Sequence, residues 1–78
     1  MKRETFDTIE RLVIDYSGPL GKFVVIKTIK DLGHTPESYP EDKNNLRKLV
    51  KRILQRAIFD ENRRNQAEKE ILKELSIH

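Results

Sequence analysis

Histidine is the first side chain to consider for metal binding or proton transfer, because the chain has two histidines and no cysteine. Neither His34 nor His78 is followed four residues later by a carboxylate or a second histidine, the spacing that places ligands on one helix face. We therefore predict no metal site and no other cofactor. His34 is expected to be an exposed loop residue and His78 part of a frayed terminus.

A glycine-containing segment between Ser17 and Lys22 is the next candidate for chemistry. Gly18 and Gly21 lack the full spacing of a phosphate-binding loop, and Pro19 removes a backbone N–H that such a loop would use. Ser17 lacks the GxSxG surroundings of a nucleophilic serine and is expected to be a capping residue. We interpret Gly18, Pro19 and Gly21 as a helix corner in which both glycines allow close helix packing.

Pairs of carboxylates are the remaining candidates for catalysis. Asp7 with Glu10 and Glu70 with Glu74 lie at helical spacing, where solvated helix faces and ion pairs account for them. No residue set in the sequence has the types and spacing of a catalytic site. The sequence therefore predicts a protein that is not an enzyme.

Charge is unevenly distributed along the chain. The formal net charge is +3 at pH 7, yet residues 43–58 contain six basic residues and no acidic one, while residues 34–42 contain three acidic residues and no basic one. A helix over residues 43–58 would present a positive face able to meet phosphates, an acidic protein or an anionic surface. The basic strip, as we call this set, consists of Lys43, Arg47, Lys48, Lys51, Arg52 and Arg56.

Nucleic-acid binding through the basic strip is an alternative function. All five aromatic residues lie outside the strip, so it lacks the interleaved rings that stack on bases. The connection that precedes it is longer than the turn of a helix-turn-helix motif. Lysine and arginine also commonly occupy solvated helix faces, where their stems cover apolar surface. Nucleic acid is therefore the second candidate partner, after protein.

Helical spacing of apolar residues defines the first element and its end. An amphipathic helix is predicted over residues 5–16 from the apolar positions Phe6, Ile9, Leu12, Val13 and Tyr16. Gly18 suits the end of this helix, and Pro19 suits the first position of the next one.

Residues 20–32 are ambiguous between helix and strand. The β-branched residues of this segment favour a strand, but Pro19 before it and Gly33 after it are typical helix boundaries, and we predict a helix. Apolar residues would then nearly encircle this helix, which indicates a central element or one whose second face meets a partner. The candidate interaction surface consists of Phe23, Val24, Val25, Ile26 and Ile29.

The second half of the chain predicts two more helices. Residues 33–40, with two prolines, are expected to form a loop. The third helix begins between Pro40 and Asn45 and continues to about Ala57. A fourth runs from Asp60, a suitable N-cap, to about Leu75. Its polar first half, residues 61–66, either lies on the surface or continues the third helix.

The length of 78 residues predicts one domain over residues 1–78, an all-α, compact bundle of four short helices. A chain this short buries only about 60% of its unfolded surface, which leaves little room for a substrate cavity. The apolar run at residues 23–26 is far shorter than the ~20 residues of a membrane span. Because the sequence lacks cysteine and a signal-peptide pattern, we expect a cytoplasmic protein.

The corner Tyr16-Ser17-Gly18-Pro19-Leu20-Gly21-Lys22 joins an amphipathic segment to an apolar one, in an aromatic-x-Gly-Pro-aliphatic-small-basic pattern. With the leucine-rich segment at residues 45–50 and the acidic turn at residues 59–61, it resembles a short helical module appended to prokaryotic signalling proteins. That module follows kinase, regulator or roadblock-type domains. The resemblance implies an accessory role in association or regulation, and it supplies no catalytic residue.

A non-enzymatic module for protein–protein interaction or oligomerisation is the function that these features favour. Its partner is expected to be another protein or a second copy of the chain.

Overall fold

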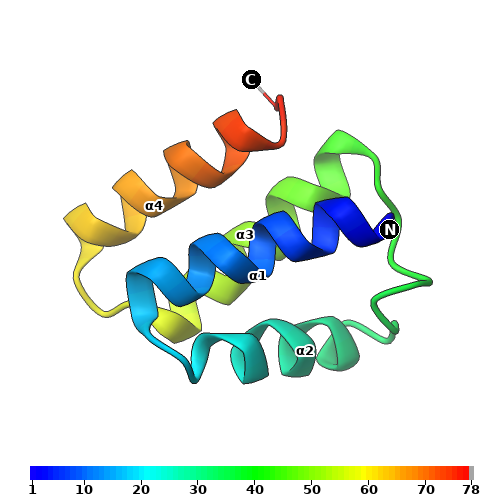
Figure 1. Cartoon of the computed structure of the whole chain (residues 1–78), viewed down its shortest axis with the longest axis horizontal. Helices are drawn as coiled ribbons and strands as arrows, with labels where there is room; N and C mark the ends of the chain where they lie inside the picture. The colour runs from blue at the N-terminus through cyan, green and yellow to red at the C-terminus, as the bar shows by residue number, and fades with distance from the viewer. Residues whose placement is uncertain (78) are drawn as a thin grey trace.

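Four helices make up the computed structural model, which describes residues 1–77 (Figure 1). They are α1 (Arg3–Ser17), α2 (Gly21–Asp31), α3 (Lys43–Ala57) and α4 (Glu61–Glu74). No strand occurs among these residues, so the prediction of an all-α bundle of four short helices is confirmed. The ambiguous segment at residues 20–32 forms the helix α2, with Leu20 and Leu32 as its caps.

The helices α2 and α4 occupy the two outer positions of the bundle. Each packs against both α1 and α3, and within the described residues α2 and α4 do not contact each other. Figure 1 shows them on opposite sides of α1, with α3 behind it. Each outer helix therefore has one face on the core and one face that no other helix of residues 1–77 covers.

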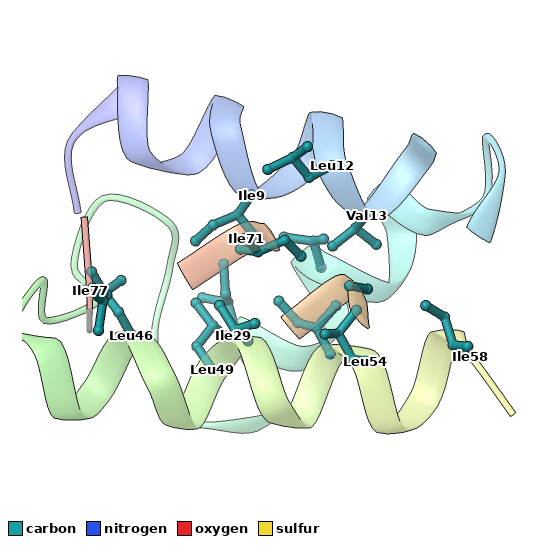
Figure 2. Packing of buried hydrophobic residues seen from close by; sticks show 14 of the residues in the cluster. Ile9, Leu12, Val13, Ile29, Leu46, Leu49, Leu54, Ile58, Ile71 and Ile77 are labelled. Carbon is teal, nitrogen blue, oxygen red and sulfur yellow. The ribbon is translucent and has the colours of Figure 1, made fainter. Parts of the chain in front are cut away.

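Apolar side chains from all four helices form one continuous core (Figure 2). The central residues Ile9, Ile29, Leu49 and Ile71 come from α1, α2, α3 and α4 respectively and are fully buried. Side chains outside the helices complete the core, namely Tyr39, Ile58 and Ile77.

Gly18 ends α1 with a positive φ of 94°, a conformation that side-chain-bearing residues rarely adopt. Its N–H donates to the Ile14 carbonyl, and a Cβ on Gly18 would meet no atom within 4 Å. Gly18 is thus required for its backbone conformation, and the prediction that it allows close packing is wrong. Pro19 lies in the turn, since α2 begins at Gly21 rather than at the proline.

Gly21 is the point of closest approach between α1 and α2. A Cβ built on it would lie 2.6 Å from Ser17 Oγ, 3.0 Å from Val13 Cγ1 and 3.3 Å from the Val13 carbonyl carbon. The Ser17 hydroxyl donates to the Val13 carbonyl oxygen at 2.7 Å, which fixes it beside Gly21. Ser17 therefore binds a carbonyl at the end of α1, and the predicted packing role of Gly21 is confirmed.

The loop between α2 and α3 is held to the start of α1. The backbone N–H of Lys2 donates to Glu41 Oε1 at 2.7 Å, and the Tyr39 hydroxyl donates to the Asn45 carbonyl oxygen at 2.7 Å. His34 is half-buried and packs edge-on against the Tyr39 ring, with 5.3 Å between the centroids. The prediction that His34 is solvent-exposed is therefore wrong, while His78 lies outside the described residues.

Aspartate N-caps start both helices of the second half. Asp42 accepts a hydrogen bond from the Asn45 backbone N–H, and Asp60 accepts one from the Asn62 backbone N–H. The predicted N-cap at Asp60 is confirmed. Because Ile58 is extended at the end of α3, α4 is a separate helix, and its polar first half lies at the surface.

Replacing Gly21 with alanine tests the close contact. Gly21→Ala should lower the unfolding free energy by about 1–3 kcal/mol, because Val13 and Ser17 must move to admit the added methyl group. Ordinarily alanine stabilises a helix relative to glycine by about 1 kcal/mol. Urea denaturation followed by circular dichroism measures the change.

The double variant Ser17→Ala/Gly21→Ala provides the matched comparison. It removes Ser17 Oγ, the atom nearest to the added methyl group. Its loss of unfolding free energy should therefore be smaller than the sum of the losses in the two single variants. A Gly21→Ala variant at least as stable as the parent chain would contradict the close contact.

The hydrogen bond to Glu41 makes stability depend on pH. The Lys2 backbone N–H, followed by the Thr5 hydroxyl, lowers the pKa of the Glu41 carboxyl from its ordinary value of 4.5. A lowered pKa in the folded state stabilises the fold above pH 4.5, and the contribution is lost as the pH falls through the folded-state pKa. The parent chain should have a higher unfolding free energy than Glu41→Gln above pH 4.5, and this difference should shrink below pH 4.5. Denaturation at a series of pH values measures it. An advantage that grows on acidification would contradict this assignment.

Candidate functional site

Three large apolar side chains lie on the outer face of α2 and its N-cap. Leu20 is 72% exposed, Phe23 58% and Ile26 44%. They recur every third residue and form a continuous ridge, which we call the apolar row. The row faces away from the core, where Val25 and Ile29 are fully buried.

This arrangement corrects the predicted interaction surface. Phe23 and Ile26 are available to a partner, whereas Val25 and Ile29 belong to the core and are not. Val24 is half-buried and packs against the core cluster. Leu20 was missed as a surface residue, although it is the most exposed member of the row.

Lysines flank the apolar row. Lys22, Lys27 and Lys30 are all exposed, and Lys22 Nζ lies 5.3 Å from the centroid of the Phe23 ring. The only acidic residue of α2 is Asp31, and its carboxylate contacts the Arg56 guanidinium at 2.9 Å. The outer face of α2 is therefore both apolar and positively charged.

A hollow of about 420 Å³ lies beside Ile26. Its apolar walls are contributed by α1, α2 and the loop that follows α2, while Asp7 and Glu37 are its acidic lining residues and Arg3 its basic one. The apolar lining residues are Met1, Phe6, Ile26 and Pro36. Sequence patterns gave no sign of this hollow, because its walls come from three separate segments.

The basic strip divides into residues with acidic neighbours and residues facing solvent. Arg56 donates to Asp31 and to the Thr28 hydroxyl at 3.2 Å. At the other end of α3, Lys43 lines a second hollow together with Glu4, Glu41 and Glu74. Arg47 is half-buried, whereas Lys48, Lys51 and Arg52 are the exposed middle of the strip, and Arg52 lines a third hollow together with Asp31 and Arg56.

Side chains from α1 and α4 meet beside the helix corner. The Tyr16 hydroxyl donates to the Glu70 carboxylate, and this hydrogen bond raises the pKa of Tyr16 above its ordinary value of 10.0. Arg63 lies over the Tyr16 ring at 5.5 Å and donates to the Tyr16 carbonyl oxygen at 2.9 Å. Both bonds hold α4 against the end of α1, so the aromatic residue of the corner has a structural role.

Phe59 is another exposed aromatic side chain. It is fully exposed in the connection between α3 and α4. This connection and the corner between α1 and α2 lie at the same end of the bundle in Figure 1. Ile58, the residue before Phe59, is buried. The connection is therefore anchored in the core by Ile58, while Phe59 faces solvent.

Neither a metal centre nor a membrane span is found among residues 1–77. No group of three or more histidine or carboxylate side chains there is arranged to hold a metal ion. None of the described helices is both long enough and apolar enough to cross a bilayer.

Residues 4–78 match the family model described as Domain of unknown function (DUF8082). The chain belongs to this family. Searches of curated proteins and of solved structures gave no match. The DUF8082 match provides no link to signalling proteins, so the resemblance of the Gly-Pro corner to a signalling module stays a prediction.

Matched substitutions in α2 test which face of the DUF8082 helix is external. Ile29→Ala should lower the unfolding free energy by about 2–5 kcal/mol, because it leaves a cavity in the core. Ile26→Ala, the same change three residues earlier, should cost less than about 1 kcal/mol because Ile26 is half-exposed. Both values follow from urea denaturation at low protein concentration. Equal losses at the two positions would contradict the assigned orientation of α2.

Proposed function

We propose that this domain is a non-enzymatic protein–protein interaction module whose binding surface is the apolar row of α2. The observation that carries the proposal is the contrast between the two outer helices. Both have one uncovered face, but α4 exposes only polar and charged residues, whereas the α2 segment exposes Leu20, Phe23 and Ile26. Contiguous exposed apolar side chains rimmed by charge are typical of binding surfaces.

The proposed setting is accessory to a prokaryotic signalling or regulatory protein in the cytoplasm. The Gly-Pro corner of the sequence supports the signalling setting through its resemblance to appended modules. The lack of cysteine supports the cytoplasmic setting, where structural disulfides are rare. In this role the domain contributes a contact surface and leaves catalysis to its partner.

Cross-linking in cells that produce the protein tests this function. A photo-cross-linking amino acid at position 23 should give a discrete adduct, because Phe23 would lie in the interface. The matched control is the same amino acid at position 55, an exposed site on α3. Sedimentation velocity distinguishes an adduct with a second copy from an adduct with another protein. A strict monomer with equal, diffuse labelling at both positions would contradict the proposal.

Nucleic-acid binding is the second candidate function, supported by the exposed side chains Lys48, Lys51 and Arg52 on a helix without acidic residues. Binding of this kind would weaken steeply with salt as counterions are released from the phosphates. Fluorescence anisotropy with labelled duplex and single-stranded DNA at low salt tests it. We expect either no binding or a weak binding that the variant Lys48→Gln/Lys51→Gln/Arg52→Gln does not reduce. A salt-sensitive affinity lost in that variant would favour this second function.

A further inference from the structure

We infer that the apolar row binds an acidic amphipathic helix of another protein, which lies along α2 and places an apolar side chain in the hollow beside Ile26. The inference rests on the proposed function, since it names the partner chemistry of the same surface.

Charge complementarity points to an acidic partner. Lys22, Lys27 and Lys30 are exposed around the row, and the one carboxylate of α2, Asp31, is already paired with Arg56. Carboxylates on both flanks of a partner's apolar face would meet these ammonium groups. Such rim charges set specificity and the rate of association, while the apolar row supplies the contact area.

The same charges oppose pairing with a second copy through this face. A two-fold symmetric dimer brings identical patches together, so the lysines of one α2 would face those of the other. Like charges at such a contact are repulsive. The surface therefore favours a partner of different sequence.

The geometry of the row favours a helix as the bound element. Backbone N–H and C=O groups within α2 are used by the helix, and no sheet edge exists among residues 1–77 to accept an added strand. Recognition must then occur through side chains. A ridge of residues at every third position packs into the groove of a neighbouring helix.

The hollow indicates where the apolar anchor of the bound helix lies. Asp7 and Glu37 line it, and Arg3 Nε lies 3.9 Å from Asp7 Oδ2. The exposed lysines of α2 attract acidic residues of the partner, whereas the hollow, which is lined by carboxylates and by the cation Arg3, offers no such attraction. An apolar anchor therefore lies over Phe6 and Ile26, and the acidic residues of the partner lie along Lys22, Lys27 and Lys30.

A protein also fits this surface better than a bilayer does. Leu20 to Ile26 span only about 9 Å along the helix axis. The concave hollow at one end of the row would stay unfilled against a flat headgroup layer, whereas a protruding side chain fills it.

Peptide binding to the full chain tests the inference. The probe is an amphipathic helical peptide with leucines on one face and glutamates on both flanks, and its match carries lysine at every glutamate position. Calorimetry should give at least about tenfold tighter binding of the glutamate peptide at low salt. Amide chemical-shift changes should concentrate at residues 20–30 and around Phe6.

Charge-reversed variants give the control. Lys22→Glu/Lys27→Glu/Lys30→Glu should invert the preference between the two peptides. Lys48→Glu/Lys51→Glu/Lys69→Glu, which changes net charge equally away from α2, should retain it. If the first variant does not fold by circular dichroism, Lys22→Gln/Lys27→Gln/Lys30→Gln should abolish the preference.

The outcomes separate failure of the inference from failure of the proposed function. Equal binding of both peptides at residues 20–30 would overturn the acidic partner and leave the interaction surface intact. No binding of either peptide would overturn both. Binding to vesicles of phosphatidylcholine with phosphatidylserine, but to neither peptide, would replace the protein partner with an anionic membrane.

Discussion

The close approach of α1 and α2 at Gly21 fixes how α2 is rotated about its own axis. Only hydrogen fits between this backbone and the side chains of Val13 and Ser17, so the Gly21 side of α2 must face α1. Val25 and Ile29 follow on that side and enter the core, and Thr28 is buried there with its hydroxyl bonded to the Val24 carbonyl oxygen. Rotating α2 to bury Phe23 instead would expose two fully buried residues and break this contact. This steric constraint therefore decides which apolar residues of α2 are buried in the core and which are exposed.

The number of helices explains why the outer face stays uncovered. In a bundle where α1 and α3 lie between α2 and α4, neither outer helix is covered on its far side by another helix of residues 1–77. The sequence of α4 matches that position, because its outer face is polar throughout. The sequence of α2 does not match an uncovered position, because its outer face is apolar. Burying side chains such as Phe23 against a partner contributes about 25 cal/mol per Å² of apolar area. The lysines around the row keep such a surface hydrated in the unbound chain and select the charge of what binds it.

Much of the fold was predictable from local patterns, because the apolar spacing of α1 and α3, the turn formers and the cap at Asp60 each act over a few residues. The helical state of residues 20–32 was predictable from its boundaries in spite of its β-branched run. The face of α2 that meets the core was not, because apolar residues nearly encircle it and the choice depends on a contact with Val13. The half-buried state of His34, the ion pair of Arg56 with Asp31 and the hollow beside Ile26 also depend on segments distant in sequence. Spacing alone places Val25 and Ile29 on the candidate surface and Arg56 in the basic strip with no indication of its ion pair.

Thiol accessibility along α2 tests most directly whether the contact at Gly21 sets its outer face. The chain has no cysteine, so single cysteines at positions 20, 23, 25, 26 and 29 can each be alkylated without background. We expect Leu20→Cys, Phe23→Cys and Ile26→Cys to react at rates close to that of an unfolded control, and Val25→Cys and Ile29→Cys to react at least about 100-fold more slowly, as core positions do when they open only by unfolding. Equal rates at positions 25 and 26, or faster labelling at 25 and 29, would contradict the orientation of α2 and with it the proposed binding surface.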